Sequence, residues 1–216
     1  KNDGLLHCYK RYQNFCVQHN NDIQLRLFKR ETLMISTRQP LLSLLDAAHL
    51  DYQLHEHPAV FTAEEGEQYC VHIPGAHVKN LFLRNEKKTA YWLVTIKYHK
   101  RVDLSQLAKI LNSGRLSFAN HHDLQTILCV TPGSVTPIAI INDHARRVKL
   151  IFDQDLLQEE HINIHPMENT STITMRLADL QNFIEQKHQI KIDFATIPEK
   201  SLNLVSNDFK SKHSYI

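Results

Sequence analysis

Two apolar segments rich in β-branched and aromatic residues, 76–83 and 89–98, are separated only by the polar stretch 84–88. A short polar connection between two such segments predicts a β-hairpin. The pair places antiparallel β-structure in the middle of the chain. Any fold proposed for the sequence must accommodate it.

Apolar spacing and turn residues around this hairpin predict further elements. Together they favour an α+β fold with a mixed, largely antiparallel β-sheet and packed helices over a doubly wound parallel sheet. The expected helices are 40–48, 62–69, 103–112, 121–130 and 177–187, and the other expected strands are 52–57, 135–141, 147–152, 171–175 and 190–194. The pair 135–141 and 147–152 is expected to form a second hairpin, because a polar turn separates the two strands.

A chain of 216 residues with 42% hydrophobic residues can bury one ordinary core. Residues 1–33 are polar and irregular, and Met34 is a candidate start. We therefore expect an upstream or loosely attached extension at 1–33, one folded domain at 34–195 and a C-terminal tail at 196–216.

Charge and cysteine content narrow the class of protein. Apolar runs fall far short of the roughly 20 residues that span a bilayer, so no membrane segment is expected. The four cysteines have no CxxC spacing, which fits a reducing cytoplasm. Residues 79–101 hold seven Lys or Arg against one Glu, which is either a nucleic-acid contact or a solvated charged face.

Common catalytic signatures are missing from the sequence, including GxSxG, GxxxxGK[ST], GxGxxG and HExxH. Histidines occur in close pairs, such as His55 with His57 and His161 with His165, but no third ligand follows at a recognised metal spacing. We expect neither a metal nor a cofactor, and a metal-assisted hydrolase stays as an alternative.

Glycine is scarce, with five in the chain, and two of the five stand directly before apolar segments. Gly75 and Gly133 each follow a proline, and each taken alone indicates a turn that requires positive φ. A turn at 133–137 could also aim consecutive backbone N–H groups at an oxyanion or a water molecule. Lys79 lies in the apolar strand after Gly75 and needs an anion, a carbonyl group or solvent.

Three motifs occur in a fixed order: Gly-x-His-x-Lys-Asn-Leu-Phe-Leu-Arg from Gly75, Gly-Ser-Val-Thr-Pro from Gly133, and His-Pro-Met-x-Asn-Thr from His165. In this order they resemble the YbaK-type aminoacyl-tRNA deacylases, over about residues 38–195. The wording after Lys79 is similar to the prolyl-tRNA editing branch, which contains the free-standing ProX-type alanyl-tRNA(Pro) deacylases and the insertion domain of bacterial prolyl-tRNA synthetases.

This resemblance implies hydrolysis of the ester of mischarged tRNA(Pro), with Ala-tRNA(Pro) as the expected substrate and the acceptor end as the bound part. Alternatives are the cysteinyl-tRNA(Pro) deacylase branch and a non-catalytic module that binds the acceptor end. Transient contact with prolyl-tRNA synthetase or an elongation factor is a further expectation. The implied catalytic residues are Lys79, Gly133, Ser134 and Val135, and the implied substrate-binding residues are Asn80, Pro137, His165 and Asn169. Phe61 and Thr62 are added to the pocket from their order in the chain alone.

Overall fold

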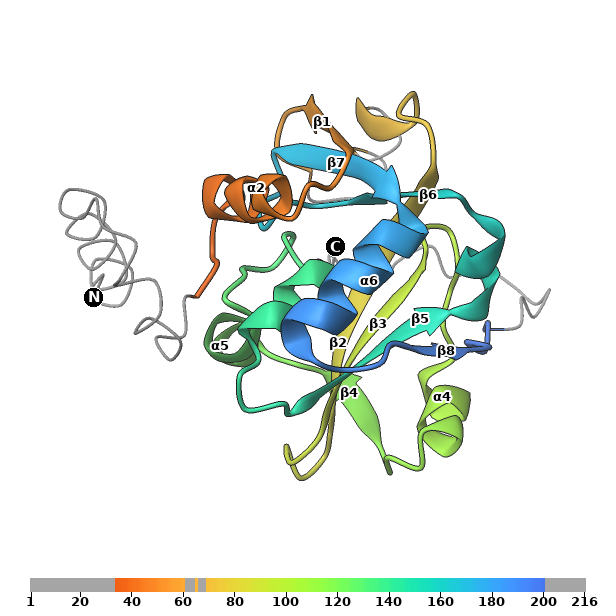
Figure 1. Cartoon of the computed structure of the whole chain (residues 1–216). Coiled ribbons are helices and arrows are strands. Elements are labelled where there is room, and N and C mark those ends of the chain that lie inside the picture. The colour runs from red at the N-terminus through yellow and green to blue at the C-terminus, as the bar shows by residue number, and fades with distance from the viewer. Residues whose placement is uncertain (1–33, 61–64, 66–68, 201–216) are drawn as a thin grey trace, which may run out of the picture. The chain divides into compact units, whose positions relative to one another are not determined.

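The computed structural model describes residues 34–60, 65 and 69–200 (Figure 1). The predicted extension at 1–33 and most of the predicted helix at 62–69 lie outside the described residues. No helix in the described part of the chain is long and apolar enough to cross a membrane.

The described strands form one eight-stranded sheet, in the order β1-β7-β6-β2-β3-β5-β8 with β4 also paired to β2. Four pairings are antiparallel and three are parallel. The predicted mixed sheet with packed helices is confirmed. The strands are β1 (Tyr52–Glu56), β2 (Ala76–Asn85), β3 (Tyr91–Lys97), β4 (Leu116–Phe118), β5 (Val148–Asp153), β6 (His161–Ile164), β7 (Ser171–Arg176) and β8 (Asp193–Ala195).

Helices cover both faces of this sheet (Figure 1). The helices are α2 (Arg38–Ala47), α4 (Leu104–Ile110), α5 (His121–Asp123), η2 (Leu124–Leu128), η3 (Pro137–Asn142), η4 (Gln154–Gln158) and α6 (Leu177–His188). Helix α6 packs its buried side chains into the larger core and crosses in front of β2 and β3 in the view. Helix α4 buries Leu107 in the second core on the other face.

The predicted hairpin is β2–β3, with Leu81 opposite Val94 and Phe82 opposite Leu93. Side chains alternate between the two faces of a strand. Phe82 and Leu93 therefore lie in the larger core, whereas Leu81 and Val94 lie in the second one. Each of these four side chains is buried, and full burial of such a side chain contributes about 1.5–3 kcal/mol.

The predicted second hairpin is wrong. Residues 137–142 form the 3-10 helix η3 instead of a strand, and Pro137 stands at its start. The side chains from Pro137 to Ile140 are all buried, and an apolar run buried on every side does not reveal its secondary structure by periodicity. The predicted partner strand exists as β5, which pairs in parallel with β3.

Three other expectations need correction. The helix expected at 121–130 is one turn of α-helix followed by the π-helix η2, and Cys129 ends it with φ 56. Strands β4 and β6 were not predicted, since each has only three or four residues. Residues 196–200, which were expected to belong to the tail, contact the fold, because Ile197 is 1% exposed and Glu199 bridges Val102; the rest of the expected tail, 201–216, lies outside the described residues.

Candidate active site

Strand β2 changes its partner along one edge, and the change leaves a gap. That edge pairs with β6 at Ala76 and His77, and with β4 from Leu83 onward. Between these two pairings, no described strand pairs with this edge of β2. The carbonyl of His77 accepts from the Tyr98 amide on the β3 side, so alternation turns the backbone of Asn80 toward the open edge.

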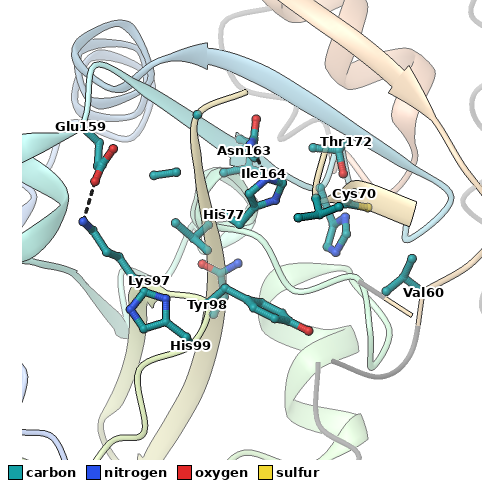
Figure 2. A pocket seen from close by; sticks show the side chains of 16 residues that line it. Val60, Cys70, His77, Lys97, Tyr98, His99, Glu159, Asn163, Ile164 and Thr172 are labelled. Atoms are coloured by element: carbon teal, nitrogen blue, oxygen red, sulfur yellow. Dashed lines mark hydrogen bonds and ion pairs between the residues drawn. The ribbon is translucent and has the colours of Figure 1, made fainter. Parts of the chain in front are cut away.

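A cavity of about 420 Å³ lies at this open edge. It falls within the range of about 300–1,000 Å³ typical of small-molecule sites. Figure 2 shows the side chains that surround it. Its lining residues are Val60, Cys70, Val71, Gly75, Ala76, His77, Val78, Asn80, Lys97, Tyr98, His99, Glu159, Asn163, Ile164, His165 and Thr172.

One wall of the cavity is polar because strands β6 and β7 alternate. Ile162 and Ile173 point into the larger core, which leaves Asn163, Thr172 and Thr174 on the opposite face. The Thr174 hydroxyl donates to Asn163 Oδ1 at 2.6 Å, and Asn163 Nδ2 lies 3.3 Å from His77 Nε2. A connected set of polar side chains therefore backs the cavity (Figure 2).

A backbone carbonyl determines the tautomer of His165 in this wall. His165 Nδ1 lies 3.2 Å from the carbonyl oxygen of Ser171, and His57 Nδ1 lies 2.8 Å from that of Pro58. A carbonyl oxygen only accepts, so in the neutral ring of His165 Nδ1 carries the proton and Nε2 keeps a lone pair. Burial lowers the pKa of His165, and the neighbouring His57 lowers it further.

Asn80 connects the cavity to the turn at 133–137. Its Nδ2 donates to the carbonyl oxygen of Val135 at 2.9 Å, and its Oδ1 accepts from the Thr95 hydroxyl at 2.8 Å. Gly133 has φ +87, as the expected turn requires. The turn thus lies behind Asn80, but none of its residues lines the cavity among those described. Ser134 is buried, with its amide donating to Thr131.

Lys79 points to the other side of the sheet from Asn80. It lies opposite Ile96, whose side chain belongs to the second core. Burial and the nearby Arg101 lower the pKa of Lys79, while Glu199 opposes that shift. Its side chain does not line the cavity, so the structure brings Asn80 and His165 together and leaves Lys79 apart from them.

The remaining expected site residues that are described, Asn169 and Pro137, have structural roles. Asn169 exchanges hydrogen bonds with Val60, since its Nδ2 donates to the Val60 carbonyl and its own carbonyl accepts from the Val60 amide. It therefore anchors a wall of the cavity. Pro137 is buried at the start of η3. Phe61 and Thr62 lie outside the described residues.

Sequence reasoning missed several lining residues, including Asn163, Thr172 and Glu159. Asn163 lies on β6, a strand that was not predicted. An alternating Ile-Asn-Ile-His run from Ile162 to His165 was the available signal. Gly75 was expected as a turn, and its φ is +106. A Cβ at Gly75 would also come within 3.2 Å of the His161 carbonyl oxygen.

Acids distant in sequence neutralise much of the basic cluster at 79–101. Arg84 pairs with Asp123, Lys97 with Glu159 at 2.5 Å, and Lys100 with Asp153 at 2.6 Å. A solvated basic face therefore describes only part of this cluster. In the described residues, no group of three or more His, Cys, Asp or Glu side chains could hold a metal ion.

The sequence and the fold both match known proteins. A family model described as an aminoacyl-tRNA editing domain matches residues 57–183. The prolyl-tRNA editing protein ProX of Acetoanaerobium sticklandii is 32% identical over 151 residues, which cover 70% of this chain and 92% of that protein. The prolyl-tRNA synthetase associated domain-containing protein 1 of Bos taurus is 38% identical over 152 residues, which cover 68% of this chain and 88% of that protein. A solved structure described as a proposed trans-editing enzyme for prolyl-tRNA synthetase has a TM-score of 0.57 at 21% identity over 75% of this chain and 94% of that one, which shows the same fold. The expected family is thus confirmed: this chain belongs to the aminoacyl-tRNA editing domain family and is an aminoacyl-tRNA hydrolase.

Proposed function

We propose that this enzyme removes alanine from mischarged Ala-tRNA(Pro) by hydrolysing the ester at the tRNA 3′ end. The observation that carries the proposal is the cavity that brings Asn80 and His165 together at an open strand edge. Two relatives named for prolyl-tRNA editing or its synthetase support tRNA(Pro) as the carrier. The sequence Lys-Asn-Leu-Phe-Leu from Lys79 supports alanine over cysteine as the amino acid that is removed.

Selection of alanine would follow from size. Part of the cavity wall is apolar and is formed by Val60, Ala76, Val78 and Ile164. The methyl side chain of alanine can pack against it, because a methyl group has no hydrogen bond to lose. A small pocket can exclude the larger proline side chain by steric clash, whereas it cannot exclude a smaller group in the same way. Because the whole cavity of about 420 Å³ would also hold a proline side chain, this discrimination requires the aminoacyl group to bind against the apolar wall, where it would spare the correctly charged Pro-tRNA(Pro).

Ester hydrolysis requires a proton acceptor and a donor for the charge that develops on the carbonyl oxygen. The pKa of His165 is lowered by burial, so the ring stays neutral near pH 7 and its Nε2 can accept a proton from water or a ribose hydroxyl. The backbone N–H of Asn80 at the open edge is our candidate for the oxyanion donor. No described carbonyl outside β2 accepts from it.

Lys79 and the turn at 133–137 keep supporting roles in this proposal. Lys79 keeps its place on the resemblance to the editing family alone, since its side chain lies on the other face of the sheet, near Arg101 and Glu199. The turn holds Asn80 in place through the Val135 carbonyl. Both roles are separate from the assignment of the cavity, so an experiment that refutes either role leaves that assignment intact.

Incubation with Ala-, Pro- and Cys-charged tRNA(Pro) tests the substrate. We expect rapid loss of the alanyl ester and no loss of the prolyl ester beyond the spontaneous rate. Loss of the cysteinyl ester alone would assign the protein to the other branch. If folded protein binds tRNA(Pro) and hydrolyses none of the three, a non-catalytic binding module is the correct description.

A further inference from the structure

Three cations on or just after the β2–β3 hairpin are ion-paired, and only one pair faces the cavity. Lys100 is 9% exposed and contacts Asp153, which is 0% exposed. Arg84 pairs with Asp123, and these side chains are 16% and 11% exposed. Pairs this deeply buried cannot open without leaving an unpaired charge in the interior.

Lys97 and Glu159 differ in both exposure and place. Their side chains are 27% and 32% exposed, and both residues line the cavity. Lys97 ends β3 opposite Val78, and Glu159 comes from the turn before β6, so the pair spans the two sides of β2. Figure 2 shows the pair on one side of the cavity, with His99 beside Lys97.

A partly solvated ion pair contributes little to folding, so opening it costs little. A phosphate group is a stronger partner for a lysine, because its charge is shared by several acceptor oxygens. The substrate class of this site brings such groups, since the phosphodiesters of the single-stranded acceptor end lie within a few bonds of the ester. The cavity lining offers no other Lys or Arg among the described residues.

We infer that the Lys97–Glu159 pair is an exchangeable phosphate site at the rim of the cavity. Lys97 leaves Glu159 and binds a phosphate of the terminal nucleotides of tRNA, which positions the ester over His165. In the free enzyme, Glu159 holds Lys97 at the rim and weakens binding of anions that lack the rest of the substrate. This inference rests on the proposed function for its substrate class.

The exchange predicts opposite effects for the two partners of one ion pair. Loss of the lysine removes the phosphate contact and weakens binding of RNA. Loss of the charge of Glu159 frees the lysine and removes a repulsive carboxylate, so RNA binds more tightly. A pair that only stabilises the fold would make both substitutions harmful or both neutral.

Binding is measured with an uncharged tRNA(Pro) acceptor microhelix that ends in single-stranded CCA, by fluorescence anisotropy at several salt concentrations. We expect Lys97→Met to raise Kd roughly tenfold and to reduce the slope of log K against log salt by about 0.7, the value for one phosphate on a single strand. Glu159→Gln should lower Kd several-fold, and Lys97→Arg should bind within about threefold of wild type. Lys149→Met is the matched control, because Lys149 is exposed on β5 and does not line the cavity.

Lys97→Met with an unchanged Kd and salt slope would overturn the phosphate site. So would Glu159→Gln that weakens binding as much as Lys97→Met in protein with an unchanged Tm. Because the RNA in this assay carries no amino acid, the measured binding is independent of hydrolysis. Binding that depends on Lys97 in a protein inactive on all charged tRNA(Pro) would support the site and refute the proposed function.

Discussion

Asn80 offers the sharpest test of how the cavity is built, because its side chain makes two separable hydrogen bonds. Substitution to alanine removes the bonds to Val135 and to Thr95. A hydrogen bond contributes about 0.5–1.5 kcal/mol net, so Asn80→Ala should destabilise the fold by about 2 kcal/mol. At about 2–4 °C per kcal/mol for a domain of this size, Tm should fall by roughly 4–8 °C.

Thr95→Val is the matched variant, because it removes one bond and keeps the amide that holds the turn. We expect it to cost about 1 kcal/mol and to leave the rate of deacylation near that of wild type. Asn80→Asp keeps the acceptor for Thr95 but places an oxygen against the Val135 carbonyl. It should lose activity at least as strongly as Asn80→Ala.

Thermal unfolding gives the stability of each variant, and single-turnover hydrolysis of Ala-tRNA(Pro) gives the chemical step. The measurement is made well below the lowest Tm, so that all variants are folded. An Asn80→Ala protein with wild-type Tm would show that the two bonds do not hold the turn. Equal loss of activity in Thr95→Val and Asn80→Ala would refute the role assigned to the turn.

Changes at His165, Lys79 and Gly75 give four further predictions. Because burial lowers the pKa of His165, the unfolded chain binds this proton more readily than the folded protein does. The stability that results is present above about pH 6.5 and is lost as the pH falls toward the lowered pKa. Between about pH 8 and pH 5, the Tm should therefore fall less steeply in His165→Gln than in wild type. The acid limb of kcat should also lie below about pH 6.5, and a limb above that value would exclude His165 as the proton acceptor. Lys79→Ala should lower kcat for Ala-tRNA(Pro) at least tenfold while Tm changes little, and full activity would remove Lys79 from the mechanism. Gly75→Ala should cost about 1–3 kcal/mol in urea unfolding, since φ +106 is strained for alanine and its Cβ meets the His161 backbone; wild-type stability would contradict this.

Local pattern predicted the parts of this fold whose periodicity differs from their surroundings. The β2–β3 hairpin has β-branched residues bounded by a polar turn, and α6 has an apolar stripe at helical spacing, so each could be assigned from a short window. The helix η3 could not, because Ile138 and Ile140 are buried whichever structure they adopt. Strand β6 is too short to stand out from a loop.

The candidate site divides in a similar way. Asn80 and His165 stand in motifs that the sequence alone could relate to a family, and the structure places both in one cavity. Lys79 stood in the same motif, but strand alternation turns its side chain to the other face of the sheet. A motif specifies which residues occur together, whereas the direction of each side chain depends on how its strand pairs.

By itself the sequence determined the family, the central hairpin and the positive-φ turns, because motifs and turn residues act over a few neighbouring positions. Tertiary structure alone decided the open edge of β2, the polar wall that includes Asn163 and the pairing of Lys97 with Glu159. The two members of that ion pair are separated by 62 positions in the chain. Only the sheet order brings them to one cavity, and sheet order depends on pairings between distant strands that no local pattern encodes.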